Sequence, residues 1–327
     1  MEKKYEGYLK EAGNVHLAYY IEAADTLGIK YEVLIPSLMA KFQTEKKHWY
    51  IINTATPLTN TPSTTIAKRK NLTNTVLANF NIPVPKQEIL RTKEDAIKFF
   101  NMYKNIVIKP SQQLGGNGVT LLPRNKGDVI KAFKYAYDKS HANEDSKVIG
   151  EEFVEGQNYR LLVLGNRVIG IVRRKSAFAI GNGKDNIKTL IKNKNMERSK
   201  QLLKPILIDN EVKLRLQNLG INMNHVPKAG EEIILRYNCN LSTGGTTQEC
   251  ANETHQYYKD IAINAVHAIG AQFGGVDIIT PDITKPSKCV VNEINYNPGL
   301  RLHYKVDEGE AVKVAIPIIK YISEINS

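Results

Sequence analysis

The chain of 327 residues (36.7 kDa) is long enough to hold about two domains, and its 42% hydrophobic and 24% charged residues exclude a disordered or fibrous protein. The sequence has no apolar run near the ~18 residues that cross a bilayer, and it starts without the apolar stretch of a signal peptide, so we expect a cytoplasmic protein with no membrane partner. Its formal charge of +12 comes from lysines and arginines along the whole chain without an aromatic stacking platform, which favours a small anionic ligand such as a nucleotide over nucleic acid.

The first 62 residues predict a small βαβ-like unit ahead of the main fold. Apolar residues at helical spacing predict a helix over 15–27 that ends at Gly28. Strands are expected over 31–35 and 49–53. The stretch 54–63, with two prolines and several threonines, is typical of a linker, and we place the first domain boundary there.

From residue 64 onward, strands and helices alternate, which indicates an α+β fold. Up to residue 139 we expect helices over 64–79, 93–103 and 127–139 and strands over 87–90, 106–109 and 119–122. A tight turn at Gly165-Asn166 then predicts an antiparallel meander of strands over 148–153, 159–164 and 167–174.

The polar stretch 177–228, rich in lysine and asparagine, predicts short helices on a mobile lid. The last third of the chain predicts strands over 232–237, 276–280 and 288–294 and helices over 253–270 and 310–322.

A glycine-rich turn, Gly115-Gly116-Asn117-Gly118, lies between two predicted strands. Because no helix follows it, it is neither a Walker loop nor a dinucleotide fingerprint. Two readings stay open: the backbone amides close over phosphates while Lys109 neutralises one of them, or the segment is a plain hairpin-like turn.

Three oxygen-bearing side chains predict a site for a hard metal ion. Glu293 and Asn295 stand two apart on one strand and therefore on one face, and Asp277 lies on the expected neighbouring strand. Carboxylate and amide oxygens suit magnesium bound to substrate phosphates. Asp277 lies among apolar neighbours, which argues against an ordinary surface acid. The three cysteines are too scattered for a zinc site or a disulfide framework.

A third group of acids, Glu151 to Glu155, ends an apolar strand before Gly156. Such a strand can offer backbone hydrogen bonds and one carboxylate to an adenine edge, although single acids of this kind are more often solvated.

Taken in chain order, these features resemble the ATP-grasp superfamily of carboxylate-amine ligases, and the closer likeness is to the ATP-grasp domains of cyanophycin synthetase and of bifunctional bacterial glutathione synthetases. The likeness is carried by Glu151-Glu152-Phe153-Val154-Glu155-Gly156 with Tyr159-Arg160, by Leu235-Arg236 with Asn240-Leu241-Ser242-Thr243-Gly244-Gly245, and by Asn297-Pro298-Gly299 with Arg301 and His303.

The resemblance implies an ATP-grasp fold over 63–327 behind a short pre-ATP-grasp unit over 1–62. Within the domain it implies a smaller lobe over about 82–155, a lid over about 177–228 and a metal-binding lobe over about 230–327.

The resemblance also assigns the cofactors, ATP and magnesium, with two ions expected and Mn²⁺ as an alternative. ATP would be held at the phosphates by Lys70, Lys109 and the loop with Gly115, Gly116 and Gly118, and at adenine by Glu151 and the backbone of Phe153 and Val154. Asn158 stands where such families usually place an acid for the ribose. The metal ligands would be Asp277, Glu293 and Asn295.

For catalysis, the resemblance implies that Arg236 faces the transferred phosphate, with its fork matched to the oxygens. Asn240, Ser242, Gly244 and Gly245 would form the acyl-phosphate and substrate loop. Arg301 and His303 would meet a substrate carboxylate, and Arg160 is a further substrate-binding candidate that can equally form a structural ion pair.

The implied activity is amide-bond formation between a carboxylate and an amine through an acyl phosphate, with release of ADP and phosphate. We expect a freestanding ligase with anionic amino-acid or peptide substrates, and we leave a homo-oligomer open. One alternative is a ligase whose acceptor is a protein or ribosomal peptide. Another is a nucleotide-binding regulatory module without turnover, because Asn158 and Asn182 replace acids that these families usually carry.

Overall fold

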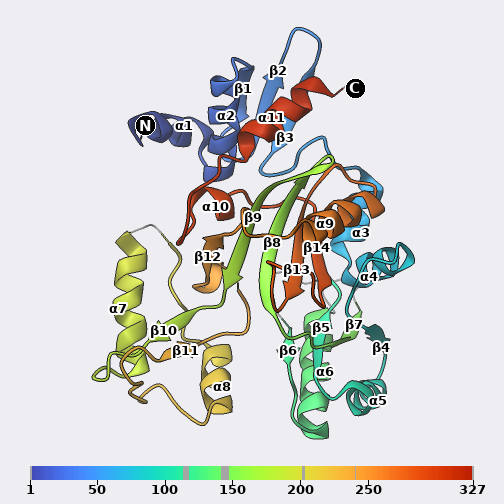
Figure 1. The fold of residues 1–327 in the computed structure, drawn as a ribbon, viewed down its shortest axis with the longest axis vertical. Coiled ribbons are helices and arrows are strands. Elements are labelled where there is room, and N and C mark those ends of the chain that lie inside the picture. The colour runs from blue at the N-terminus through green and yellow to red at the C-terminus, as the bar shows by residue number, and fades with distance from the viewer. Residues whose placement is uncertain (1, 113–117, 141–146, 201–202, 240, 326–327) are drawn as a thin grey trace. The chain divides into compact units, whose positions relative to one another are not determined.

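The computed structural model describes residues 2–112, 118–140, 147–200, 203–239 and 241–325 (Figure 1). These residues form two compact units: unit 1 takes 2–112, 118–172 and 249–325, and unit 2 takes the described residues of 173–248. Helices and strands occur together throughout, so the expected α+β class is confirmed. Within the described ranges, no helix is both long and apolar enough to span a bilayer.

Unit 1 begins with two helices followed by a three-stranded antiparallel sheet. The elements are α1 (Glu2–Ala12), α2 (Val15–Thr26), β1 (Lys30–Ile35), β2 (Met39–Gln43) and β3 (His48–Ile52). This order differs from the βαβ-like unit expected from the sequence. The pattern search missed β2, in which only Ala40 and Phe42 face the core and the intervening Lys41 does not.

The core of this N-terminal segment is completed by residues from distant parts of unit 1. The helix α11 (Ala315–Glu324) packs beside α2, as Figure 1 shows with α11 in red among the blue elements. Leu162, Leu164 and Phe273 of the central sheet reach into the same cluster. The N-terminal segment is therefore built onto the main sheet and shares its hydrophobic core.

The central sheet has the strand order β12-β9-β8-β13-β14. These strands are β8 (Gln157–Leu164), β9 (Arg167–Lys175), β12 (Thr246–Glu249), β13 (Phe273–Thr280) and β14 (Val290–Asn295). The helix α9 (Gln256–Ala268) covers one face, where Leu161, Val276 and Ile278 belong to its core cluster. The short helix α10 (Arg301–Tyr304) follows β14.

A smaller four-stranded sheet in unit 1 has the order β4-β7-β5-β6. Its strands are β4 (Gln87–Leu90), β5 (Ile106–Pro110), β6 (Thr120–Leu121) and β7 (Val148–Glu152), and its helices are α5 (Lys93–Tyr103) and α6 (Lys126–Ser140). Ahead of it, the single helix expected over 64–79 is two helices, α3 (Thr61–Lys68) and α4 (Lys70–Asn79). Arg69 has extended backbone angles and separates them.

Unit 2 has a hydrophobic core of its own. The strands β10 (Phe178–Ile180) and β11 (Glu232–Ile234) pair antiparallel, and the helices are α7 (Ile187–Lys200) and α8 (Asn210–Asn218), with a 3-10 turn η1 (Leu241–Thr243). Ile187, Ile191 and Val212 are fully or almost fully buried in this core. The short helices expected over 177–228 are confirmed, and α7 extends over 14 residues.

Glycines at two positions should respond oppositely to alanine. A Cβ at Gly150, on β7, would lie 2.8 Å from Cδ1 of Phe99, whereas a Cβ at Gly7, inside α1, meets no described atom within 4 Å. We expect Gly150→Ala to lower the free energy of unfolding by about 1–3 kcal/mol through overpacking. We expect Gly7→Ala to raise it by about 0.5–1 kcal/mol through helix propensity. Urea unfolding monitored by circular dichroism measures both, and equal effects of the two changes would contradict this packing.

Candidate functional site

The candidate site begins with a change of character along one face of the central sheet. On β8 and β13, alternate residues face away from α9, and at one end these are Leu162 and Phe273 in the N-terminal core. Further along the same face, the paired residues become Arg160 opposite Asp277 and Asn158 opposite Ile279. Because alternate residues share a face, the same face of the sheet is apolar at one end of these strands and charged a few residues further along.

A β-bulge aligns the third strand with this face. Asp277 pairs with Glu293, but the next residue, Ile278, pairs with Val291, so Asn292 is the extra residue on β14. The bulge lets Val291 and Ile294 both contribute to the core under α9 while Glu293 and Asn295 stay on the charged face. Bulges often redirect side chains next to functional sites, and this one brings the predicted ligands together.

Arg160, Asp277 and Glu293 thus form one row across β8, β13 and β14. The guanidinium of Arg160 donates two hydrogen bonds to the carboxylate of Asp277, one of them 3.1 Å from Nη2 to Oδ2. Burial lowers the pKa of Arg160, but the carboxylates of Asp277 and Glu293 together raise it by more, so the guanidinium stays charged. Gly275 is required here because a Cβ would lie 2.9 Å from Cδ of Arg160.

A second buried ion pair lies on the smaller sheet. Nζ of Lys109 on β5 lies 2.6 Å from Oε1 of Glu151 on β7, and both side chains are less than a tenth exposed. Gln87 on β4 donates to the other carboxylate oxygen at 2.9 Å. Glu151 is therefore held from both neighbouring strands, on the face opposite Ile106 and Ile108 and the helices α5 and α6.

Lys70 connects the two groups of charges. It is the first residue of α4, and its backbone N–H donates to the carbonyl of Ser111, just after β5. Burial lowers the pKa of Lys70, and the nearby Glu293 carboxylate opposes this shift. The pKa of Lys70 is also shifted by the charges of Lys109, Glu151 and Asp277. The structure therefore brings the predicted phosphate and metal residues of unit 1 into one electrostatic neighbourhood.

The donor set of this row fits a divalent cation. Asp277 and Glu293 face each other across a strand pair, an arrangement of like charges that Arg160 and Lys70 offset and that a divalent ion would offset further. Asn295 donates its amide hydrogens to the carbonyl of Gly275 at 3.3 Å, which leaves the amide oxygen as a ligand. Two carboxylates and one amide oxygen suit magnesium. Among the described residues, no cluster of three His, Cys, Asp or Glu side chains offers another metal site.

The predicted adenine residues are only partly available. The backbone N–H of Phe153 donates to the carbonyl of Asn105 at 2.9 Å, so the N–H of this residue is already bonded. Phe153 and Val154 are half-buried after the end of β7.

The glycine loop predicted to close over the phosphates is described only at Gly118. This residue has a positive φ of 76°, and a Cβ there would lie 2.7 Å from Pro110. Gly115 and Gly116 lie outside the described residues.

Arg301 and His303 lie on α10, next to the N-terminal segment. A Cβ at Gly299 would lie 3.2 Å from Cε1 of His16, and burial together with Arg301 lowers the pKa of His16. The sequence analysis did not single out His16, because one histidine at the start of an amphipathic helix carries no motif. His303 is 1% exposed, and neither ring nitrogen has a hydrogen-bond partner among the described residues.

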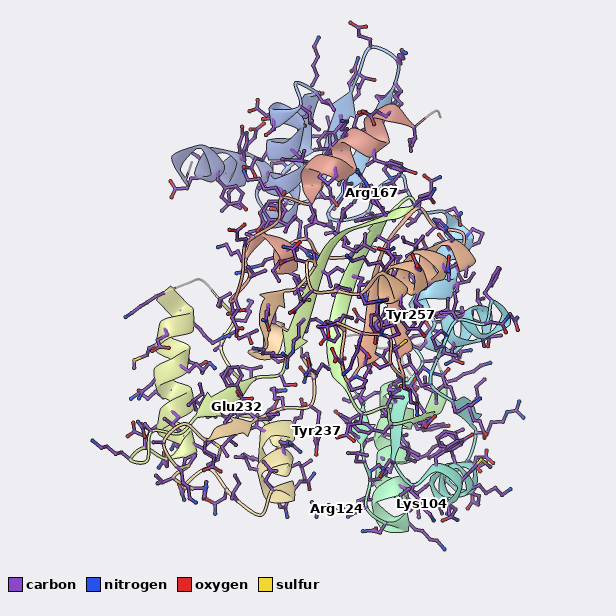
Figure 2. The ribbon with its side chains drawn as sticks, in the orientation of Figure 1. Lys104, Arg124, Arg167, Glu232, Tyr237 and Tyr257 are labelled. Carbon is purple, nitrogen blue, oxygen red and sulfur yellow. The ribbon has the colours of Figure 1, made fainter. Side chains whose placement is uncertain are left out.

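In unit 2, Arg236 is buried and its guanidinium is held by two acids at the start of α8. Asp209 and Glu211 each accept a hydrogen bond from a terminal nitrogen, while Nε has no partner among the described residues. Glu211 also accepts from the backbone N–H of Tyr237 (Figure 2) at 3.2 Å. Sequence reasoning missed both acids, because they lie more than 20 residues from Arg236 in a stretch without a motif.

The substrate loop predicted in unit 2 is described in part. Gly244 has a φ of 102° and packs so closely on Ile206 that a Cβ would lie 2.5 Å from Cγ1. Gly245 is buried, and Ser242 belongs to η1. Asn240 lies outside the described residues.

Comparison with known proteins shows which fold and which relatives the chain is similar to. Residues 67–189 match the RimK-like ATP-grasp domain family. The chain carries an ATP-grasp domain. The crystal structure of a bifunctional glutathione synthetase from Pasteurella multocida superposes with a TM-score of 0.67 and 26% identity, covering 95% of this chain and 44% of that one. The ATP-grasp fold expected from the sequence is confirmed.

Two relatives agree with the closer likeness drawn from the sequence. The glutathione biosynthesis bifunctional protein of Clostridium perfringens is 34% identical over 266 residues, which are 78% of this chain and 34% of that protein. The cyanophycin synthetase of Geminocystis herdmanii is 33% identical over 265 residues, 78% of this chain and 30% of that protein. The chain thus spans about a third of the length of either relative.

The buried pair on the smaller sheet predicts a strongly non-additive response to mutation. Lys109→Met removes the ammonium group that contacts the buried carboxylate of Glu151 and leaves the hydrogen bond from Gln87, and we expect it to lower the free energy of unfolding by about 3–5 kcal/mol. Lys109→Met with Glu151→Gln should lower the free energy of unfolding by less than the single change, because no buried carboxylate is left without its Lys109 partner. Denaturant unfolding measures both. Lys93→Met removes an exposed lysine as a control, and a double variant as unstable as the sum of its parts would contradict the pairing.

The buried His303 predicts a pH dependence of stability. Burial, assisted by the nearby Arg160 charge, lowers its pKa from the ordinary 6.5 to about 3, so between these values the unfolded chain binds a proton that the folded chain excludes. Stability should therefore fall as pH drops below 6.5, by about 2 kcal/mol at pH 5 from this group. His303→Leu should flatten this part of the profile. His48→Leu, at an exposed histidine, should not, and an unchanged slope in the His303 variant would refute the assignment.

Proposed function

We propose that this chain is an ATP-dependent ligase that joins a carboxylate to an amine through an acyl phosphate and releases ADP and phosphate. The observation that carries the proposal is the row of Arg160, Asp277 and Glu293 on the sheet face, with Lys70 acting electrostatically on the same carboxylates and on Lys109 and Glu151. Cations for phosphates and oxygen ligands for a divalent ion are both present, as phosphoryl transfer requires. The names of the relatives, a glutathione biosynthesis protein and a cyanophycin synthetase, support the same class.

In this proposal, unit 1 binds the nucleotide. Lys70 and Lys109 contact the phosphates, together with the loop that contains Gly115, Gly116 and Gly118. Because Phe153 already uses its N–H, adenine is held by Glu151, by the carbonyl of Phe153 and by the backbone of Val154. Asn158, one rung beyond Arg160 on the same face, lies near the ribose.

The proposed metal site holds two Mg²⁺ ions, and Mn²⁺ is an alternative to magnesium. Its ligands are Asp277, Glu293 and Asn295. Bound there, the ion would neutralise charge on the phosphoryl oxygens. Arg160 holds Asp277 in position, because its guanidinium donates two hydrogen bonds to the carboxylate. The protein thereby supplies a preformed pair of carboxylates to which a divalent ion can bind.

Arg236 and the loop with Asn240, Ser242, Gly244 and Gly245 act on the transferred phosphate and the acyl group. Asp209 and Glu211 fix the guanidinium of Arg236 and leave its buried Nε as a donor. Arg301 and the buried His303 face the substrate carboxylate, with His16 beside Arg301. No protein nucleophile is needed, because placement and charge neutralisation carry the reaction.

The substrates in this proposal are anionic amino acids or peptides, as the basic surplus of the chain favours. Three further points stay predictions. These are a cytoplasmic location, a homo-oligomer, and the boundaries of the N-terminal unit, smaller lobe, lid and metal-binding lobe.

The direct experiment supplies the protein with Mg-ATP and pairs of candidate carboxylates and amines, and follows ADP release and amide products by mass spectrometry. An amide formed together with stoichiometric ADP supports the ligase. ATP binding without ADP release under every pair supports a regulatory module. Mass shifts on proteins of a lysate, but none on small molecules, identify a protein or peptide acceptor.

The metal ligands give a sharper prediction. Glu293→Gln and Asp277→Asn should each lower ADP production at least about 100-fold, because charge on the triphosphate is no longer neutralised. In each variant, ATP should bind with the same affinity in the presence of magnesium and in the presence of EDTA. Calorimetry measures both affinities without turnover. Glu253→Gln, an exposed acid before α9, removes the same charge as a control. Folded variants that retain magnesium-dependent ATP binding would refute the metal assignment.

A further inference from the structure

The positive charge of the chain is concentrated in unit 2. Residues 173–248 contain 14 Lys and Arg and 6 Asp and Glu, so this quarter of the chain carries +8 of the formal +12. Eight of the 20 exposed large hydrophobic residues of the described chain also belong to unit 2. Basic and apolar side chains exposed on one small unit indicate an interaction surface for an acidic, partly apolar partner.

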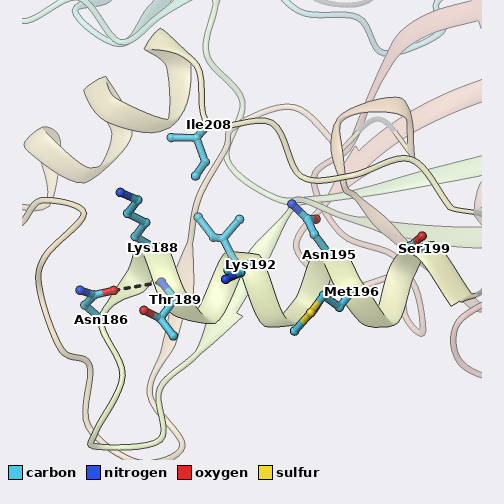
Figure 3. Close-up of a pocket in the computed structure, with 9 residues that line it drawn as sticks. Asn186, Lys188, Thr189, Lys192, Asn195, Met196, Ser199 and Ile208 are labelled. Carbon is cyan, nitrogen blue, oxygen red and sulfur yellow. Dashed lines mark hydrogen bonds between the residues drawn. The ribbon is translucent and has the colours of Figure 1, made fainter.

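A groove with both properties runs along α7 (Figure 3). It is an open cavity of about 870 Å³ between the helix and Ile208, which faces the helix from the preceding loop of α8. Lys188 and Lys192 line it, and the described lining residues include no acid and no aromatic side chain. Met196 and Ile208 supply apolar surface and are 53% and 42% exposed.

The walls of the groove are held by contacts of their own. The side chain of Asn195 accepts a hydrogen bond from the backbone N–H of Ile206 at 2.7 Å and donates to its carbonyl at 3.0 Å. Ile206 and Ile191 are buried in the core of unit 2, and the close approach of Gly244 to Ile206 fixes the segment from the other side. Asn186 caps the start of α7 by accepting from the N–H of Thr189. The groove is therefore preformed, which limits the ordering a ligand must undergo.

The spacing of the two lysines specifies the form of the ligand. Lys188 and Lys192 are four residues apart on α7, so their Cα atoms lie one turn, about 6 Å, apart on one side of the helix. Alternate residues of an extended peptide are about 6.6–6.8 Å apart and point to the same face. Carboxylates on alternate residues of an extended peptide can therefore meet both ammonium groups. The aliphatic side chains between them point to the opposite face, where Ile208 lies across from α7. The adaptable Met196, one turn after Lys192, extends the helix wall with apolar surface.

We propose that this groove binds an acidic peptide segment in extended form. Lys188 and Lys192 pair with carboxylates on alternate residues, and Ile208 on the opposite wall contacts the aliphatic residues between them. Met196 adds apolar surface beside Lys192. Nucleic acid fits less well because the groove offers no aromatic platform for bases. The inference goes beyond the proposed ligase activity, since it uses none of the residues assigned to ATP, metal or acyl transfer.

The test is fluorescence anisotropy of the full chain with a fluorescein-labelled octapeptide of alternating Glu and Leu, in the absence of ATP. Binding should weaken at least about tenfold, equivalent to about 1.4 kcal/mol, in Lys188→Glu with Lys192→Glu. Lys184→Glu with Lys213→Glu changes the charge of unit 2 equally at two exposed lysines outside the groove and should leave binding within about twofold. Circular dichroism checks that both variants fold.

Further measurements test whether binding depends on the carboxylates and on the apolar contact. A peptide of alternating Gln and Leu should bind at least about tenfold more weakly, and Ile208→Asp should weaken binding of the Glu peptide. Absence of binding, or equal loss in both lysine variants, would overturn the proposal. So would a single-stranded RNA twelve-mer that competes at lower concentration than the peptide. None of these outcomes depends on ligase turnover, so failure here leaves the proposed function standing.

Discussion

The ion pair between Arg160 and Asp277 is the constraint on which the rest of the candidate site depends. Both side chains are buried on the central strands of the main sheet, and either charge alone would be strongly unfavourable there. Pairing fixes the carboxylate of Asp277 at one place on the sheet face. The bulge on β14 then brings Glu293 beside it, so the position of the negative charge is set by the packing of the sheet before any ligand arrives.

The other basic side chains that we assign to phosphate are also paired with acids. Lys109 is paired with Glu151, and Arg236 is paired with Asp209 and Glu211. Each basic group is thereby oriented without the nucleotide, at the expense of part of its attraction for phosphate. A triphosphate must share these cations with the acids or displace them, so the net gain on binding is smaller than the count of positive groups implies.

Strand alternation was enough to predict which face Glu293 and Asn295 occupy, because their spacing is local and both lie on one strand. The order of the motifs was enough to predict the ATP-grasp fold. The partners of the basic groups could not be predicted, since Arg160 meets Asp277 across 117 residues and Arg236, which follows β11, meets acids at the start of α8. The break at Arg69 and the strand β2 were missed because each depends on tertiary packing that overrides a weak local pattern.

The interpretation of the charge changes most between sequence and structure. Along the sequence, lysines and arginines are spread without a dominant cluster, which is typical of solvated surface. Divided between the two units, the same charges give about +8 in the 76 residues of 173–248 and about +4 in the rest. A short helix such as α7 concentrates charge because residues four apart share one side, although they are separate in the sequence. Unit 2 therefore attracts anions as a whole, and its groove decides which anions gain apolar contacts as well.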